Sequence, residues 1–125
     1  MATTEIITEE GQVTEGPDMP EAMYRHSIAK FNQTTSIIIG GITSSAYYLD
    51  VTWFFNHVTQ EFQPGPRLIS GRRNHASATL QDQVTKEEIV AVVGGYNRYN
   101  PESYSIGGYL DSTEFLINGE WTQGK

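Results

Sequence analysis

The chain has 125 residues and no cysteine, and its 15 acidic against 8 basic side chains give a net charge of -7 at pH 7. An acidic chain without a stripe of Lys or Arg is a poor partner for nucleic acid or an anionic membrane, and the lack of cysteine excludes disulfides and thiolate metal sites. No apolar run approaches the roughly 18 residues of a membrane span. The acidic N-terminus lacks the apolar segment of a secretory signal, which slightly favours the cytoplasm.

In chain order, short runs rich in β-branched and aromatic residues are separated by Gly, Pro, Asn and Asp, a pattern that predicts strands. Helical periodicity is nearly absent. Residues 4–16 resemble residues 113–124 and predict a hairpin. Four strands are expected in a first unit, at residues 26–31, 36–39, 52–56 and 60–63. Four more are expected in a second unit, at residues 75–80, 89–93, 113–117 and 120–122. Asn118-Gly119 predicts a two-residue hairpin turn.

The second unit repeats the first, and the length changes fall between the apolar runs. His26 recurs as His75, 49 residues later. Three dipeptides also recur: Gly16-Pro17 as Gly65-Pro66, Gly40-Gly41 as Gly94-Gly95, and Leu49-Asp50 as Leu110-Asp111. Because loops absorb insertions that paired strands cannot, two related four-stranded units are expected.

The runs IIIGG and IVAVVGG, which contain the two glycine pairs, are apolar without alternation. A strand covered on one face alternates apolar and polar residues, whereas a continuous apolar run implies cover on both faces. The glycines are expected where the backbone takes a positive φ or a neighbour approaches closely. Four-stranded antiparallel units stacked face to face are typical of propeller blades.

The ordered combination of these marks resembles the kelch repeat family. It comprises the glycine pairs, the Gly-Pro dipeptides followed by His26 and His75, and Phe62 and Trp121 near the ends of the units, with Val13 at the same place in the N-terminal hairpin. The resemblance implies an all-β fold: a partial kelch-type β-propeller with two four-stranded antiparallel blades and the C–D hairpin of a preceding blade. The expected boundaries are residues 1–17 for the preceding blade, 18–66 for the first blade and 67–125 for the second.

A propeller closes with about four to eight blades, so two blades leave apolar faces bare. We therefore expect further blades, either from a longer chain, which is the favoured interpretation, or from self-association. The resemblance also implies a platform that binds other proteins. The predicted function is a kelch-repeat protein–protein interaction module within a longer propeller.

The predicted binding surface follows from blade topology. In a blade with strands A to D, the B–C and D–A connections emerge at one end, and here they gather Tyr and Arg, which are enriched at interaction hot spots. The candidate partner contacts are Arg25, Arg72, Arg73, Tyr47, Tyr96, Arg98, Tyr99 and Tyr104. In similar kelch propellers an arginine of the D–A link often contacts the ligand, so Arg72 and Arg73 are the best candidates and an acidic peptide is the predicted ligand. Charge reversal at both is expected to weaken partner capture without lowering the melting temperature.

The alternative is that the arginines pair with the abundant acids and the tyrosines pack over strand edges. The blades would then be purely structural, completing a propeller whose binding or catalytic site lies elsewhere.

The sequence offers little for catalysis. His26 and His75 occupy the same position in adjacent units, where a hydrogen bond that fixes the repeat is expected rather than metal ligation. Asp50 and Asp111 are equivalent in the same way and are expected to accept backbone N–H bonds in turns. No Ser-His-Asp arrangement, phosphate-binding loop or nucleophile elbow occurs, and the active-site residues of enzymatic kelch propellers have no match. No catalytic residue, metal or cofactor is expected, and the protein is not expected to be an enzyme.

Overall fold

The structure is a computed structural model that describes residues 5–7, 11–19, 22–43, 49–97 and 109–124. These residues form an all-β fold of antiparallel sheets, none of which closes on itself. The strands are β1 Glu5–Ile7, β2 Val13–Glu15, β3 Ser27–Lys30, β4 Thr35–Ile39, β5 Thr52–Asn56, β6 Glu61–Pro64, β7 Ala76–Gln81, β8 Glu88–Val93, β9 Thr113–Ile117 and β10 Glu120–Gln123. Over the described ranges, no helix is long and apolar enough to cross a membrane.

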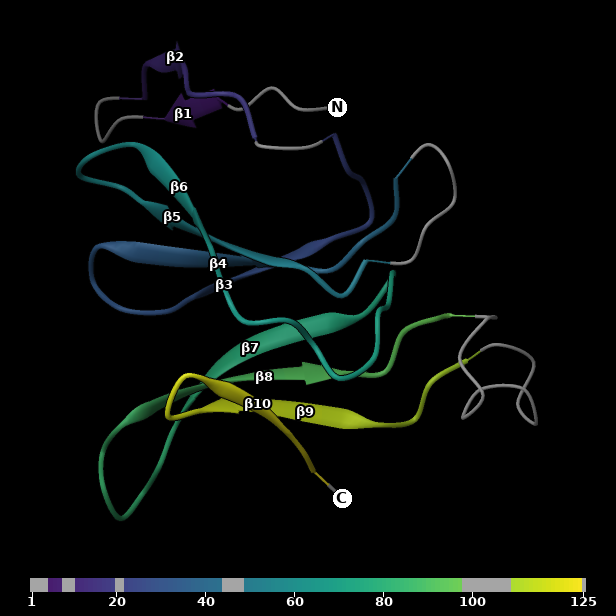
Figure 1. Ribbon diagram of the computed structural model, residues 1–125. Coiled ribbons are helices and arrows are strands. Elements are labelled where there is room, and N and C mark those ends of the chain that lie inside the picture. Colours follow the sequence, from purple (N-terminus) through teal and green to yellow (C-terminus); the bar gives the residue numbers. More distant parts are fainter. Residues whose placement is uncertain (1–4, 8–10, 20–21, 44–48, 98–108, 125) are drawn as a thin grey trace.

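Each of the two larger sheets is a meander in which consecutive strands pair. The first sheet has the order β3-β4-β5-β6, the second has the order β7-β8-β9-β10, and β1 and β2 form a separate hairpin. The first sheet lies between this hairpin and the second sheet (Figure 1). The prediction of two four-stranded units preceded by a hairpin is confirmed, and the eight strands of the units begin and end within one residue of the predicted bounds.

The strand register confirms that the units are equivalent. Ile39 pairs with Thr52 in the first sheet as Val93 pairs with Thr113 in the second. The aromatic or apolar mark near the end of each unit pairs with the strand before it in the same way: Phe62 with Phe55, Trp121 with Leu116, and Val13 with Ile7. Both residues of the Asn118-Gly119 turn have a positive φ, 52° and 80°, as a two-residue hairpin turn requires.

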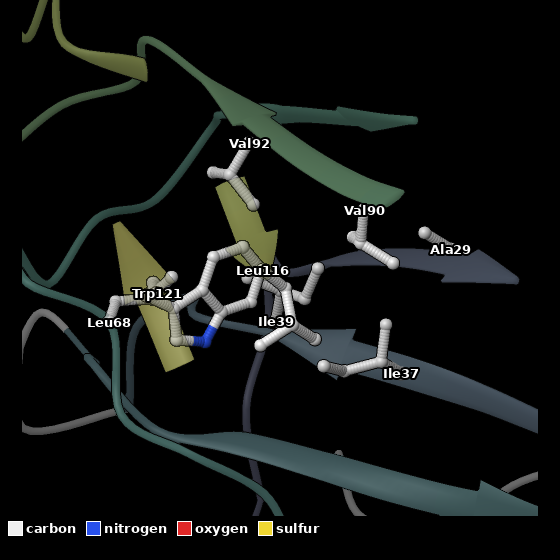
Figure 2. Packing of buried hydrophobic residues seen from close by; sticks show 8 residues of the cluster. All are labelled: Ala29, Ile37, Ile39, Leu68, Val90, Val92, Leu116 and Trp121. Atoms are coloured by element: carbon white, nitrogen blue, oxygen red, sulfur yellow. The ribbon is translucent and has the colours of Figure 1, made fainter. Parts of the chain in front are cut away.

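The hydrophobic core lies between the two sheets (Figure 2). It consists of Ala29, Ile37, Ile39, Leu68, Val90, Val92, Leu116 and Trp121, with Phe54 packed against it. Because alternate residues of a strand point to opposite faces, Ile37 and Ile39 face the second sheet and Ile38 faces away. Ile38 is also buried, so the continuous apolar run of β4 is covered on both sides, as predicted. The run of β8 follows the prediction only in part, because its last residue, Val93, is 51% exposed.

The first strands of the two sheets, β3 and β7, lie next to each other where the sheets meet, which we call the junction. The Ser77 hydroxyl donates to the Ile28 carbonyl over 3.4 Å and the Thr79 hydroxyl to the Lys30 carbonyl over 2.5 Å, and both bonds join residues 49 positions apart. Residues that are equivalent in the repeat, 49 positions apart in the sequence, are therefore neighbours across the junction of the two sheets. Lys30 adds an exposed ion pair with Glu88 at 3.2 Å.

Candidate functional site

A hollow of about 500 Å³ opens at the end of the second sheet where the link from β6 enters and β8 ends. Its lining residues come from the link between β6 and β7 and from the connection between β8 and β9. These are the D–A link and the B–C connection in which the sequence analysis places the candidate contacts. They are Arg73, Asn74, Gly95, Tyr96, Tyr109 and Leu110.

Backbone hydrogen bonds fix the walls of this hollow. Arg73 and Tyr96 exchange two of them, at 3.2 and 2.9 Å, and Tyr96 also forms a β-bridge with Tyr109. The Leu110 amide donates to the Gly95 carbonyl over 2.9 Å. The three segments therefore form a small irregular extension of the sheet, so the side chains on it are held in place by the main chain.

The side chains of the hollow combine a cation with two aromatic rings. The Arg73 guanidinium carbon lies 4.9 Å from the centroid of the Tyr96 ring, a cation–π distance. The Tyr96 and Tyr109 rings meet nearly edge to face, with centroids 5.3 Å apart and planes at 72°. Tyr109 is exposed and Arg73 is half-buried, so a ligand in the hollow would meet both residues.

The first unit has the same backbone arrangement with different side chains. Tyr24 and Ile42 exchange two backbone hydrogen bonds, at 3.1 and 2.9 Å, at the positions of Arg73 and Tyr96. The shared scaffold is thus part of the repeat, whereas Arg73 and Tyr96 are specific to the second unit. The residue equivalent to Tyr109 is also a tyrosine, Tyr48, which lies outside the described residues. Arg25, one of the predicted partner contacts, is exposed, and its guanidinium carbon lies 5.6 Å from the Tyr24 ring centroid.

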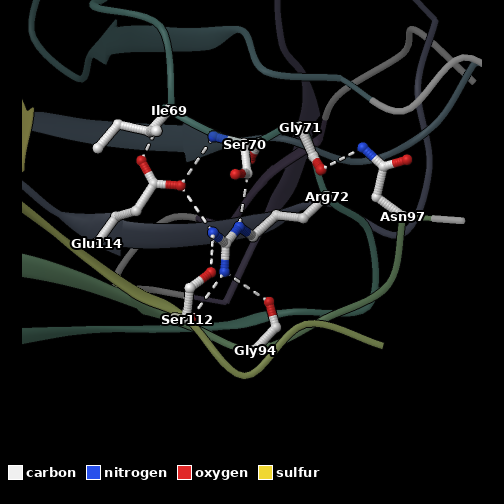
Figure 3. A network of polar contacts seen from close by, with 8 residues as sticks. All are labelled: Ile69, Ser70, Gly71, Arg72, Gly94, Asn97, Ser112 and Glu114. Carbon is white, nitrogen blue, oxygen red and sulfur yellow. Dashed lines mark hydrogen bonds and ion pairs between the residues drawn. The ribbon is translucent and has the colours of Figure 1, made fainter. Parts of the chain in front are cut away.

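The side chain of Arg72 is fully buried. This burial contradicts the prediction that Arg72 contacts a partner. Its guanidinium donates to a Glu114 carboxylate oxygen over 2.7 Å and to the hydroxyl and carbonyl oxygens of Ser112 over 3.1 Å each. Further donor bonds run to the carbonyls of Gly94 (2.7 Å) and Ser70 (3.3 Å) (Figure 3). A guanidinium bonded in this way inside the fold is structural. The structure therefore changes the expectation for this residue: charge reversal at Arg72 is now predicted to lower the melting temperature.

Glu114 completes this network from β9. One carboxylate oxygen accepts from the Ile69 amide over 2.6 Å, and the other accepts from the Ser70 amide over 3.2 Å. At the far end of the link, the Asn97 side-chain amide donates to the Gly71 carbonyl over 2.8 Å (Figure 3). The link from β6 to β7 is therefore fixed to the second sheet by side chains along its length.

Among the described residues, His26 and His75 form no well-oriented repeat-fixing hydrogen bond. His75 is buried, and neither of its ring nitrogens has a hydrogen-bond partner of good geometry within the described part of the chain, although a backbone group of Ile39 in the first unit lies close enough to oppose the lowering of its pKa. Its Cε1 atom lies only 2.9 Å from where a Cβ on Gly40 would stand, so the ring packs over the glycine pair of the first unit. Burial, assisted by the nearby Arg72 charge, lowers the pKa of His75 to about 4. The equivalent His26 is exposed.

The acidic residues that the structure describes are not grouped as metal ligands. Among the described residues, no group of three or more His, Cys, Asp or Glu side chains could hold a metal ion. The Asp50 carboxylate forms an ion pair with Arg67 at 2.6 Å, rather than the backbone bonds expected for it. Arg67 and Arg72 thus follow the alternative in which arginines pair with acids.

The remaining predicted contacts, Tyr47, Arg98, Tyr99 and Tyr104, lie outside the described residues. Of the predicted set, Arg73 and Tyr96 are brought together, and Arg25 lies on the first unit. Two residues were not singled out from the sequence. Tyr109 stands just before the repeated Leu110-Asp111, and Glu114 is a charged residue at the core-facing position of an otherwise apolar strand, which is a signal for a buried ion pair.

Comparison of the chain with protein-family models finds no matching family, and comparison with curated proteins finds no significant match.

Proposed function

We propose that the chain is a kelch-type interaction module, part of a longer β-propeller, and that it binds a partner protein through the hollow lined by Arg73, Tyr96 and Tyr109. The observation that carries this proposal is the arginine stacked on tyrosine at an open end of the second unit. The first unit builds the same backbone scaffold with Tyr24 and Ile42 in place of Arg73 and Tyr96. Side chains that differ between equivalent positions are not set by the repeat, which fits a role in recognition.

Two features of the architecture support the propeller part of the proposal. The units are four-stranded meanders stacked face to face, and their first strands, β3 and β7, bring equivalent residues of the repeat next to each other. Since no family model matches, the proposal rests on this geometry and on the marks of the sequence.

The chemistry of the hollow favours an acidic peptide. A guanidinium engages a carboxylate through paired, charge-assisted hydrogen bonds, and the tyrosine rings offer apolar surface with hydroxyl groups at their tips. The Arg73–Tyr96–Tyr109 group positions no nucleophile or general base, so we propose binding without catalysis.

An array of Asp/Glu-rich peptides, each paired with its Asn/Gln counterpart, tests this proposal. We expect the chain to retain acidic peptides and to release their amide counterparts. Arg73→Glu should reduce retention by about tenfold or more, because one such charge-assisted contact contributes at least about 1.4 kcal/mol. Lys86→Glu is the matched control, since it makes the same change of charge at an exposed turn remote from the hollow. The proposal would be overturned if the Arg73→Glu variant retained acidic peptides as well as the parent chain does. It would also be overturned if the parent chain retained the amide peptides as well as the acidic ones.

The burial of Arg72 favours a second candidate, a purely structural role. In that case the Tyr96 and Tyr109 rings cover the sheet end rather than a ligand. The chain then retains no acidic peptide, and the double variant Tyr96→Ala/Tyr109→Ala lowers the melting temperature. Under the binding proposal the double variant loses peptide retention instead.

A further inference from the structure

A second pocket, of about 290 Å³, lies where the hairpins of the first sheet turn. Thr35 begins β4, Asn56 ends β5 and Glu61 begins β6, and all three line the pocket. It is separate from the hollow beside β8, whose lining residues belong to the second unit. The described residues that line this pocket all belong to the first unit and are Phe31, Thr35, Phe54, Asn56, Thr59, Glu61 and Gln63.

The apolar wall of this pocket continues the hydrophobic core. Phe54 packs against the core cluster, and the Phe31 and Phe54 ring centroids are 4.7 Å apart, with their planes at 56°. Thr35 pairs with Asn56 two positions along the strands from Phe54, so both lie on the same face as this ring. Phe31 remains 37% exposed. An apolar chain placed against the two rings would therefore extend the core and remove apolar surface from water.

A carboxylate without a partner lines the same pocket. The Glu61 side chain forms no hydrogen bond or ion pair with another described residue, and Glu61 is the charged member of the described lining. Lys30, the cation next to Phe31 in the sequence, is already paired with Glu88 at 3.2 Å. A cation that enters the pocket would therefore meet an uncompensated negative charge beside aromatic rings, a combination that attracts ammonium groups.

The acceptors around the pocket suit an ammonium group rather than a guanidinium. The Glu61 carboxylate, the Gln63 side-chain oxygen and the Thr59 hydroxyl come from three positions of the β5–β6 hairpin. An ammonium group has three donors that point in different directions, whereas a guanidinium engages paired acceptors in one plane. The volume of the pocket also suits one side chain rather than a longer ligand.

We propose that this pocket binds the side chain of a lysine from a basic partner peptide. The four-carbon stem lies along Phe31 and Phe54, and the ammonium group donates to Glu61 and Gln63 at the rim. A lysine side chain buries its stem in this way while its charged end stays near water. The net charge of -7 favours a basic partner as well. The proposal does not depend on what the Arg73 hollow binds.

Titration with Nα-acetyl-lysine methylamide, followed by NMR at the backbone amides of residues 54–63, tests the proposal. Nα-acetyl-norleucine methylamide is the neutral counterpart, because it has the same four-carbon stem without the ammonium group. We expect the lysine compound to shift these amides and to bind about fivefold more tightly than the norleucine compound. Glu61→Gln should remove this preference. Phe31→Leu, which copies Leu80 of the second unit, should weaken binding of the lysine compound by about threefold.

Glu120→Gln is the matched control, because it makes the same change of charge at the equivalent position of the second unit. Binding of the lysine compound should be unchanged in this variant. Equal binding of the lysine and norleucine compounds would overturn the proposal. Equal losses in Glu61→Gln and Glu120→Gln would also overturn it, because the net charge alone would then attract the ammonium group. Tighter binding of Nα-acetyl-arginine methylamide would contradict the choice of lysine.

Discussion

Arg72 and Glu114 form an ion pair from which water is excluded, with exposed fractions of 0% and 1% for their side chains. The pair is stable in place because carbonyls, a hydroxyl and two backbone amides satisfy the remaining donors and acceptors. Removing one member of such a pair leaves a buried charge without compensation, which costs about 3–5 kcal/mol. The first unit avoids this risk, because the apolar residues Met23 and Trp53 stand at the equivalent positions.

Arg72→Met, which copies the first unit, is therefore expected to lower the free energy of unfolding by about 3–5 kcal/mol. The double variant Arg72→Met/Glu114→Gln should recover part of that loss, because the uncharged amide oxygen still accepts from the Ile69 amide. Denaturant unfolding measures both variants. A loss below about 1 kcal/mol for Arg72→Met would contradict a structural role for the guanidinium.

His75 is expected to make stability depend on pH. Its pKa is about 4 in the folded protein, against about 6.5 in an unfolded chain. Between these values the unfolded chain binds more protons, so the free energy of unfolding falls as the pH drops from about 6.5 to 4, by roughly 3 kcal/mol in all. His75→Gln should lose less stability than the parent over that range in denaturant titrations at several pH values. Parallel slopes for the variant and the parent would contradict the assignment.

Among the elements, the first glycine pair lets two segments approach the end of β4. A Cβ on Gly40 would stand 2.7 Å from the Arg72 carbonyl oxygen of the next unit. Gly41 has a φ of 106°, and a Cβ there would stand 2.8 Å from the Tyr24 carbonyl oxygen of its own unit. Gly119 has a φ of 80° in the β9–β10 turn, but nothing lies within 4 Å of its Cβ position. Both glycines have a positive φ, but only Gly41 has close neighbours. Comparing the same substitution at both therefore separates the free energy lost to backbone strain from that lost to a steric clash.

Gly119→Ala is expected to lower the free energy of unfolding by about 1 kcal/mol, through backbone strain alone. Gly41→Ala should cost at least about 3 kcal/mol, because a clash with the Tyr24 backbone and disruption of the junction add to the strain. Thermal or denaturant unfolding of the pair gives the comparison. Equal losses would show that the glycine pair is needed for its φ values and not for close approach.

The elements could be predicted from the sequence because the local signals agree. The β-branched runs, the Asn118-Gly119 turn and the recurring dipeptides all place strand ends, and the repeat lets one unit check the other. The ion pair was missed because the residues next to Arg72 in the sequence look like an exposed link. Only the register of β9 brings Glu114 beneath it. The absence of a well-oriented hydrogen bond to His75 could not be inferred either, because it depends on how the two units stack.

The candidate site was predicted in part for the same reason. Topology places the D–A and B–C connections at one end, which was enough to bring Arg73 and Tyr96 together. It does not decide which of two adjacent arginines turns inward. In the structure Arg72 points into the second sheet and Arg73 lines the hollow, as expected for neighbours on an extended segment whose side chains alternate.

The whole molecule is held together by one arrangement: two equivalent meanders stack face to face, and the first buries its inner face on the second. The Ile39 side chain lies at the centre of this contact, beside Trp121 and Leu116 of the second sheet (Figure 2). The carbonyls of Leu49 and Arg25 accept from backbone amides of the second unit, and the Ile28 carbonyl accepts from the Ser77 hydroxyl.

Proton–proton contacts measured by NMR in solution test this arrangement most directly. We expect the methyl groups of Ile37 and Ile39 to show contacts with those of Val90 and Val92, and Ile39 to contact the Trp121 indole. The Gly41 amide should also exchange more slowly than the Gly95 amide, because among the described residues only Gly41 donates to a carbonyl of the other unit. Isoleucine methyl groups that contact only residues of their own sheet, with equally fast exchange at both glycines, would contradict the stacking of the two units.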